Sequence, residues 1–361
     1  MRPFSPRVLI PASWGFVSFM LRLCARFTTK RGFVSGKTRP FVVTGATRQP
    51  YARGPDLTEG VVAWAQRTLG ESSPTVITEL RQLDKLEVNR SFDILIVTND
   101  WLMEVLSRPF WQQVRSSFYL LRKRTPIWVM LPDMYIPQQT LLSASLVSFS
   151  GGLHPMIVNS PQSAMRFGLP NPTGPHFWTL PSFGGEIEEP LGWNQKEQLA
   201  IGSKSGETKR VEMIECLIPE LERNGYRLTW SHSSELPYSV YLDALRQSKI
   251  AIVPTMLQAE YQSGPRGYRK KLSETILTGR VWESFASGCA LLTNKNQDLE
   301  DLGFEPMVHY VPIPFLFDSE LSWQLPSDAT LSRIAEMGRK RFIDLLWKET
   351  APSLPRPFPR N

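Results

Sequence analysis

The densest group of chemically capable side chains lies between Arg266 and Asn294. Four cations occur there within six residues: Arg266, Arg269, Lys270 and Lys271. Cations beside a helix N-terminus form a common phosphate site, because the helix end offers free N–H groups and a positive dipole. The pattern predicts such a helix over 273–287, with Ser273 as N-cap and Gly288 as its stop. The alternative is a solvated basic loop.

Two residues within this helix, Arg280 and Glu283, are three positions apart and therefore share a face. A helical carboxylate that points into a ligand site can accept hydrogen bonds from both ribose hydroxyls, as acidic residues do in dinucleotide-binding folds. Together with the cations it would suit a nucleotide. The alternative is an ordinary surface ion pair, and spacing alone does not separate the two.

The elements that must position these residues alternate between strands and helices. Residues 93–98 (DILIVT) form a continuous apolar run, which is typical of a parallel strand buried on both faces. The other strands predicted in the first half are 8–11, 41–44, 127–131 and 156–159, and its helices are 14–28, 58–69, 101–124 and 138–149. This alternation predicts a doubly wound parallel sheet.

A second alternating half follows a stretch without helical or strand periodicity, 170–190, which carries five prolines and three glycines. Its predicted strands are 199–202, 226–231, 250–254, 290–293 and 309–311, and its helices are 208–224, 240–247, 273–287 and 328–348. The predicted fold class is α/β, with two Rossmann-like doubly wound domains that face a cleft. The expected divisions are 1–170, a linker at 171–192, 193–327, and a closing helix with a proline-rich tail at 328–361.

The composition is that of a globular protein, with 42% apolar and 21% charged residues. Three scattered cysteines, Cys24, Cys216 and Cys289, fit neither a disulfide framework nor a zinc site, so a reducing, cytoplasmic location is expected. No Asp-x-Asp, H-E-x-x-H, G-x-S-x-G or G-x-G-x-x-G motif occurs.

Charge is uneven along the chain, whose net charge is +7. The first 55 residues hold ten basic residues and no acidic one, which predicts an anionic neighbour: a membrane face, a phosphate-bearing substrate or nucleic acid. An organellar transit peptide is another possibility. No apolar run is long enough to span a membrane. Residues 14–53 could contact an anionic membrane surface, or 14–28 could be a helix packed on the sheet.

Motifs in the second half resemble the donor domain of GT-B glycosyltransferases, group-1 type, and within it the spore-maturation-like transferases. The resemblance rests on VYLDALRQSKIAIVPT at 240–255, GRVWESFASGCALLTN at 279–294, LGF…HYVPI at 302–313 and the final helix. The family's R-x-x-E-x-x-A-x-G pattern falls on Arg280, Glu283, Ala286 and Gly288. The resemblance covers about residues 195–350; residues 1–170 are similar to the acceptor domain in architecture only.

This resemblance implies transfer of a sugar from a nucleotide-sugar donor, with no metal and no cofactor besides that substrate. Glu283 would hold the donor ribose, and Arg280 with the 266–271 cations would bind the diphosphate. The loop that contains Gly202, Ser203 and Lys204 would face the donor, or form a simple turn. Many retaining relatives carry a second glutamate at the position of Thr275, whereas the nearest one here is Glu274. Whether the reaction retains or inverts configuration therefore stays open.

An inverting transferase needs a general base for the acceptor hydroxyl. Candidates at strand ends of the first half are Asp100, Asp133 and His154; the aspartates could instead cap helices, and the histidine could be a loop residue. Expected acceptors are cell-envelope, lipid-linked or other glycans, at the inner membrane face if the enzyme is peripheral. The alternatives are a glycosyltransferase that modifies DNA bases, gripping the phosphate backbone, and an inactive nucleotide-sugar-binding module.

Overall fold

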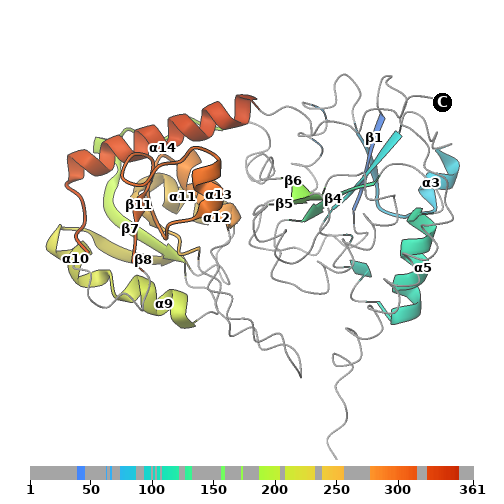
Figure 1. The fold of residues 1–361 in the computed structure, drawn as a ribbon, viewed down its shortest axis with the longest axis horizontal. Helices are drawn as coiled ribbons and strands as arrows, with labels where there is room; N and C mark the ends of the chain where they lie inside the picture. Colours follow the sequence, from blue (N-terminus) through green and yellow to red (C-terminus); the bar gives the residue numbers. More distant parts are fainter. Residues whose placement is uncertain are drawn as a thin grey trace, which may run out of the picture.

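The computed structural model describes two parallel sheets, each in its own part of the molecule (Figure 1). The described residues are 39–44, 62, 66, 74–86, 93–98, 101, 104–105, 108–121, 127–131, 156–158, 172–173, 187–203, 208–231, 238–255, 277–314 and 323–348. The predicted α/β class, with two doubly wound parallel sheets, is confirmed.

In the described part of the first half, six parallel strands form the first sheet in the order β2-β1-β3-β4-β5-β6. The strands are β1 (Arg39–Val43), β2 (Thr75–Ile77), β3 (Asp93–Val97), β4 (Ile127–Leu131), β5 (Met156–Val158) and β6 (Pro172–Thr173), with helices α3 (Gln82–Lys85) and α5 (Phe110–Leu121). The apolar run predicted as a strand is β3. Its residues Leu95, Ile96 and Val97 are fully buried, as expected where both faces of a sheet are covered.

Two expectations for the first half need correction. The helix expected over 101–124 is interrupted, because residues 108 and 109 are not helical and α5 starts afresh after Pro109. Proline has no N–H to give and clashes with the preceding turn. The stretch 170–190 does contain a strand, since β6 pairs with β5 at the edge of the first sheet. The elements expected at 8–11, 14–28 and 138–149 lie outside the described residues.

The second sheet has five parallel strands among the residues described after 187, in the order β11-β10-β9-β7-β8. The strands are β7 (Glu197–Ser203), β8 (Arg227–Ser231), β9 (Ser248–Ile252), β10 (Ala290–Thr293) and β11 (Val311–Pro312). The helices are η2 (Trp193–Gln195), α9 (Thr208–Glu215), α10 (Ile218–Arg223), α11 (Tyr238–Gln247), α12 (Gly279–Ala286), α13 (Gln297–Asp301) and α14 (Asp328–Lys348).

Helices cover both faces of this sheet, because alternate strand residues point to opposite sides. Ile250 and Ile252 belong to a buried cluster with apolar residues of α9, α10 and α14. Ala251, which lies between them, packs in another cluster with Leu242 and Leu245 of α11. The closing helix α14 approaches closely at Gly338, where an added Cβ would stand 2.5 Å from the His309 carbonyl oxygen. The missing side chain of Gly338 therefore lets α14 pack closely against the rest of this half of the molecule.

Two helix boundaries differ from expectation. The helix expected over 208–224 divides into α9 and α10 at residues 216–217, just before Pro219, a position that suits the first turn of a new helix. The helix expected to begin at Ser273 begins at Gly279, with Thr278 in the N-cap position. Its predicted stop at Gly288 is confirmed by a φ of 65°, which glycine adopts at little cost.

No helix among the described residues has the length and apolar character that crossing a lipid bilayer would require.

Candidate functional site

The strand order locates a switch point in each sheet. A switch point is the place where successive strands are added on opposite sides of a central strand. In the second sheet, β8 lies on one side of β7 and β9 on the other; in the first sheet, β2 and β3 flank β1 in the same way. In open doubly wound sheets, ligands bind outside the carboxyl ends of the strands at such a point. In the second sheet, α11 leads into β9 and α12 leads into β10, so both helices begin at this carboxyl edge.

Glu283 lies on α12 and is directed back toward this edge. Its side chain belongs to a residue that is only 4% exposed, so the surface ion pair considered above is wrong for this carboxylate. A Cβ placed on Gly279, at the start of α12, would lie 3.8 Å from Oε1 of Glu283. The carboxylate therefore reaches the first turn of its own helix, because helical side chains lean toward the N-terminus.

Tyr241, in the first turn of α11, joins Glu283 and Arg280. The guanidinium carbon of Arg280 lies 5.8 Å from the centre of the Tyr241 ring. The Tyr241 hydroxyl is hydrogen-bonded to Glu283, and burial followed by the charge of this carboxylate raises the Tyr241 pKa well above its ordinary value. Sequence reasoning missed Tyr241. The available signal was its place at the start of a helix that leads into a central strand.

The strand ends beneath these helices are tied together by buried polar groups. The Thr255 N–H donates to Oδ1 of Asn294 at 3.2 Å, and the Thr293 hydroxyl donates to the Val253 carbonyl at 2.7 Å. Asn294 also donates to the Ile313 carbonyl at 3.4 Å. These bonds link the ends of β9, β10 and β11 into one rigid edge. The Thr255 hydroxyl is buried there without a hydrogen-bond partner.

The loop expected to contain Gly202, Ser203 and Lys204 begins only after Ser203, because β7 extends to that residue. Gly202 and Ser203 lie inside β7, and Gly202 is buried. A Cβ on Gly202 would stand 3.1 Å from a methyl carbon of Ile214, so this glycine lets α9 pack on the strand. Gly202 therefore has a structural role in the contact between β7 and α9, and its predicted contact with a donor stays a prediction.

Of the predicted site residues, the structure brings Arg280 and Glu283 together around Tyr241. Gly202 and Ser203 lie in β7, as described above. The other predicted site residues lie outside the described residues: Asp100, Asp133, His154, Lys204, Arg266, Arg269, Lys270 and Lys271. The sequence predicted a helix directly after the four cations. Because α12 begins only at Gly279, the cations do not immediately precede it. Seven residues separate Lys271 from Gly279.

A second polar cluster lies at the opposite, amino edge of the same sheet, around Asp328 at the start of α14. Its carboxylate accepts hydrogen bonds from Nε1 of Trp193 at 2.9 Å, the Tyr226 hydroxyl at 2.6 Å and Nζ of Lys249 at 3.0 Å. Burial alone would raise the Asp328 pKa, but these hydrogen bonds and the Lys249 charge outweigh it and lower the pKa. The cluster ties α14 to the starts of β8 and β9.

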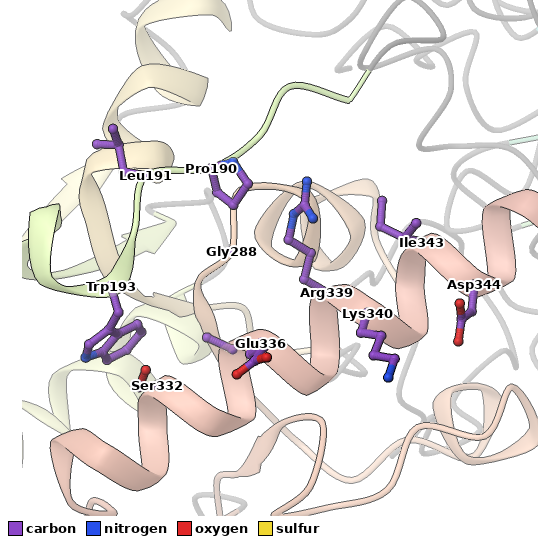
Figure 2. Close-up of a pocket in the computed structure, with 11 residues that line it drawn as sticks. Pro190, Leu191, Trp193, Gly288, Ser332, Glu336, Arg339, Lys340, Ile343 and Asp344 are labelled. Atoms are coloured by element: carbon purple, nitrogen blue, oxygen red, sulfur yellow. The ribbon is translucent and has the colours of Figure 1, made fainter.

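Two hollows lie away from the Glu283 site. A groove of about 480 Å³ runs between residues 190–193 and α14 (Figure 2). Gly288, which ends α12 and hence lies away from the carboxyl edge, lines it, and Glu336, Arg339 and Asp344 project from α14 along it. A hollow of about 390 Å³ in the first half is lined by residues after β2 and by α5. Neither includes a predicted site residue.

No protein-family model and no curated protein sequence matches the chain. Among solved structures, the sucrose-phosphate synthase from Thermosynechococcus elongatus is 10% identical, with a TM-score of 0.45 over 85% of this chain and 95% of that one. Anabaena HepE in complex with UDP is 11% identical, with a TM-score of 0.39 over 86% and 98%. An alpha1,3-fucosyltransferase is 10% identical, with a TM-score of 0.35 over 91% and 88%. All three TM-scores are below 0.5, so the function of this chain has to follow from its own residues.

Proposed function

We propose that the chain is a glycosyltransferase that holds a nucleotide-sugar donor at the carboxyl edge of its second sheet. The observation that carries this proposal is the buried Glu283 carboxylate, directed toward the start of α12 at the edge where doubly wound sheets bind ligands. The resemblance of 279–294 to the donor motif of GT-B enzymes supports the same assignment. Glu283 accepts hydrogen bonds from the ribose hydroxyls of the donor.

In the proposed reaction, the bond between the anomeric carbon and the diphosphate oxygen breaks, and the acceptor oxygen forms the new bond. The leaving diphosphate gains negative charge, which Arg280 and the N–H groups at the start of α12 stabilise. The cations at 266–271 are proposed to add to this stabilisation in place of a metal ion. Asp100, Asp133 and His154 remain the proposed candidates for taking the acceptor proton.

The proposed acceptor is a cell-envelope, lipid-linked or other glycan, reached from the cytoplasmic side of a membrane. Support comes from the acid-free, basic segment at the start of the chain, of which the structure describes Arg39 in β1 and little else. An anionic bilayer attracts such a segment at about 1 kcal/mol per cation near the surface. Charge reversal at Arg22, Arg26, Lys30 and Arg31 should abolish pelleting with phosphatidylserine vesicles.

The proposed function is tested by sugar release from UDP-, GDP- and dTDP-sugars in the presence of a chelator. Wild type should hydrolyse at least one of them slowly, and Glu283→Ala should reduce affinity for its nucleoside diphosphate by about 100-fold, because hydrogen bonds to a charged group are lost. Glu222→Ala, on the exposed face of α10, is the matched control. Equal affinity in all three proteins, or no binding by wild type, would overturn the proposal.

A further inference from the structure

The hydroxyl and the ring of Tyr241 make two separate contacts, and each one reaches a different group of the candidate site. The hydroxyl is hydrogen-bonded to Glu283, and the ring faces the Arg280 guanidinium at 5.8 Å. A residue that touches both the acid and the cation can set the distance between them. Nothing in the sequence patterns assigns Tyr241 a role.

We propose that Tyr241 is a positioning residue that orients Glu283 toward ribose and Arg280 toward the diphosphate, and thereby makes the site selective for ribonucleoside diphosphates. This inference rests on the proposed donor site. Tyr241 need not touch the ligand, because it acts through the two groups that do.

The packing of α11 supports this role. Leu242 and Leu245, which follow Tyr241 on the helix, are buried against Ile201 of β7 and Ala251 of β9. The start of α11 is therefore anchored over the switch point, and Tyr241 is fixed with it. A carboxylate held by a rigid donor keeps one orientation, whereas a free one would sample several rotamers.

Protonation supports the inference as well. Burial and the Glu283 charge keep the Tyr241 hydroxyl protonated at neutral pH, so it acts as a donor toward the carboxylate. A carboxylate can accept several hydrogen bonds at once, so Glu283 can accept those of the ribose hydroxyls while it is held by Tyr241. The face of the Tyr241 ring attracts the Arg280 guanidinium. This contact uses the face of the guanidinium, so its N–H groups, which lie in the guanidinium plane, can still donate to phosphate oxygens.

Two substitutions separate the two contacts. Tyr241→Phe removes the hydroxyl and keeps the ring, so it should reduce selectivity for UDP over 2′-deoxy-UDP, and for GDP over 2′-deoxy-GDP, by about tenfold. Tyr241→Leu removes the ring too, so it should also narrow the affinity gap between UDP and UMP. Tyr226→Phe is the matched control, because Tyr226 also donates to a carboxylate, Asp328, at the opposite edge of the sheet.

The measurement is calorimetric affinity on the full-length chain, with thermal unfolding recorded for each variant. A double-mutant cycle with Glu283→Gln adds a second readout, since Tyr241→Phe should have no further effect on ribose selectivity in that background. Wild-type selectivity in Tyr241→Phe, with Glu283→Gln impaired, would overturn this inference and leave the donor site standing. Absence of any nucleotide binding by wild type would overturn both.

Discussion

The two edges of the second sheet carry the same kinds of side chain in different settings. At the amino edge, the Asp328 carboxylate is 48% exposed and is held by donors from Trp193, Tyr226 and Lys249. At the carboxyl edge, Glu283 is buried beside Tyr241 and Arg280, above the switch point. An acid, a tyrosine and a cation thus hold elements together at one edge, and at the other they surround the place where the fold favours a ligand.

Residue types alone therefore do not distinguish a structural cluster from a ligand site, whereas the edge of the sheet on which the residues lie does. Variants at the amino edge should change the free energy of unfolding and leave nucleotide affinity unchanged. Variants at the carboxyl edge should do the reverse.

The largest expected effect is at Lys196, at the amino edge. This residue is 6% exposed, and its ammonium donates to the carbonyls of Arg246 at 2.7 Å, Ser248 at 3.2 Å and Ser287 at 2.8 Å. Lys196→Met would leave those carbonyls without this donor, so the free energy of unfolding should fall by about 3 kcal/mol in urea titrations. Lys340→Met, on the exposed side of α14, should change it by less than about 0.5 kcal/mol.

At the carboxyl edge, Arg280→Gln should weaken UDP binding by about tenfold and UMP binding much less, because the proposed partner of the lost charge is the diphosphate. The unfolding midpoint should stay within a few degrees of wild type. Arg333→Gln, on an exposed position of α14, serves as the control. A large loss of stability with unchanged affinity would reverse the comparison of the two edges.

The smallest effect concerns acid stability. Because the folded-state pKa of Asp328 is lowered, its ionised form stabilises the fold above the unfolded-state pKa of about 3.9, and this contribution is lost as pH falls through the folded-state pKa. In the Asp328→Asn variant, the free energy of unfolding should therefore fall less steeply below about pH 4 than in wild type. The difference should be less than about 1 kcal/mol, because the side chain is half exposed. If the variant lost stability below about pH 4 as steeply as wild type, Asp328 would not be the group responsible for the loss.

Much of the fold could be predicted from the sequence. This holds for elements whose own apolar pattern is clear enough to identify them without knowledge of their neighbours. The apolar runs of β3 and β9, and the uninterrupted helical periodicity of α14, predict these elements within a few residues of their observed bounds. The break before α10 and the start of α12 were not predicted, because a helix start depends on its neighbours as well as on its own residues. Ser273 looked like an N-cap, and Thr278 takes that position.

The candidate site was predictable in part. The spacing of Arg280 and Glu283 gave a shared helical face, and the α/β alternation gave the edge to which that face leads. Tyr241 could not be found in this way, since its contact with them crosses from α11 to α12 and depends on how the two helices pack. The contact between Gly202 and Ile214 of α9 could not be predicted either, since it too depends on how a helix packs on a strand.

The position of β7 in its sheet bears on how this lobe is assembled during synthesis. β7 leaves the ribosome before the four strands that join it, and it pairs with β8 on one side and β9 on the other. The helix α14, the last one that the structure describes, packs against the sheet and meets Phe285 of α12 at Gly338. A nascent chain that lacks α14 therefore exposes apolar surface of the second sheet and α12, and would depend on chaperones until α14 has emerged and packed.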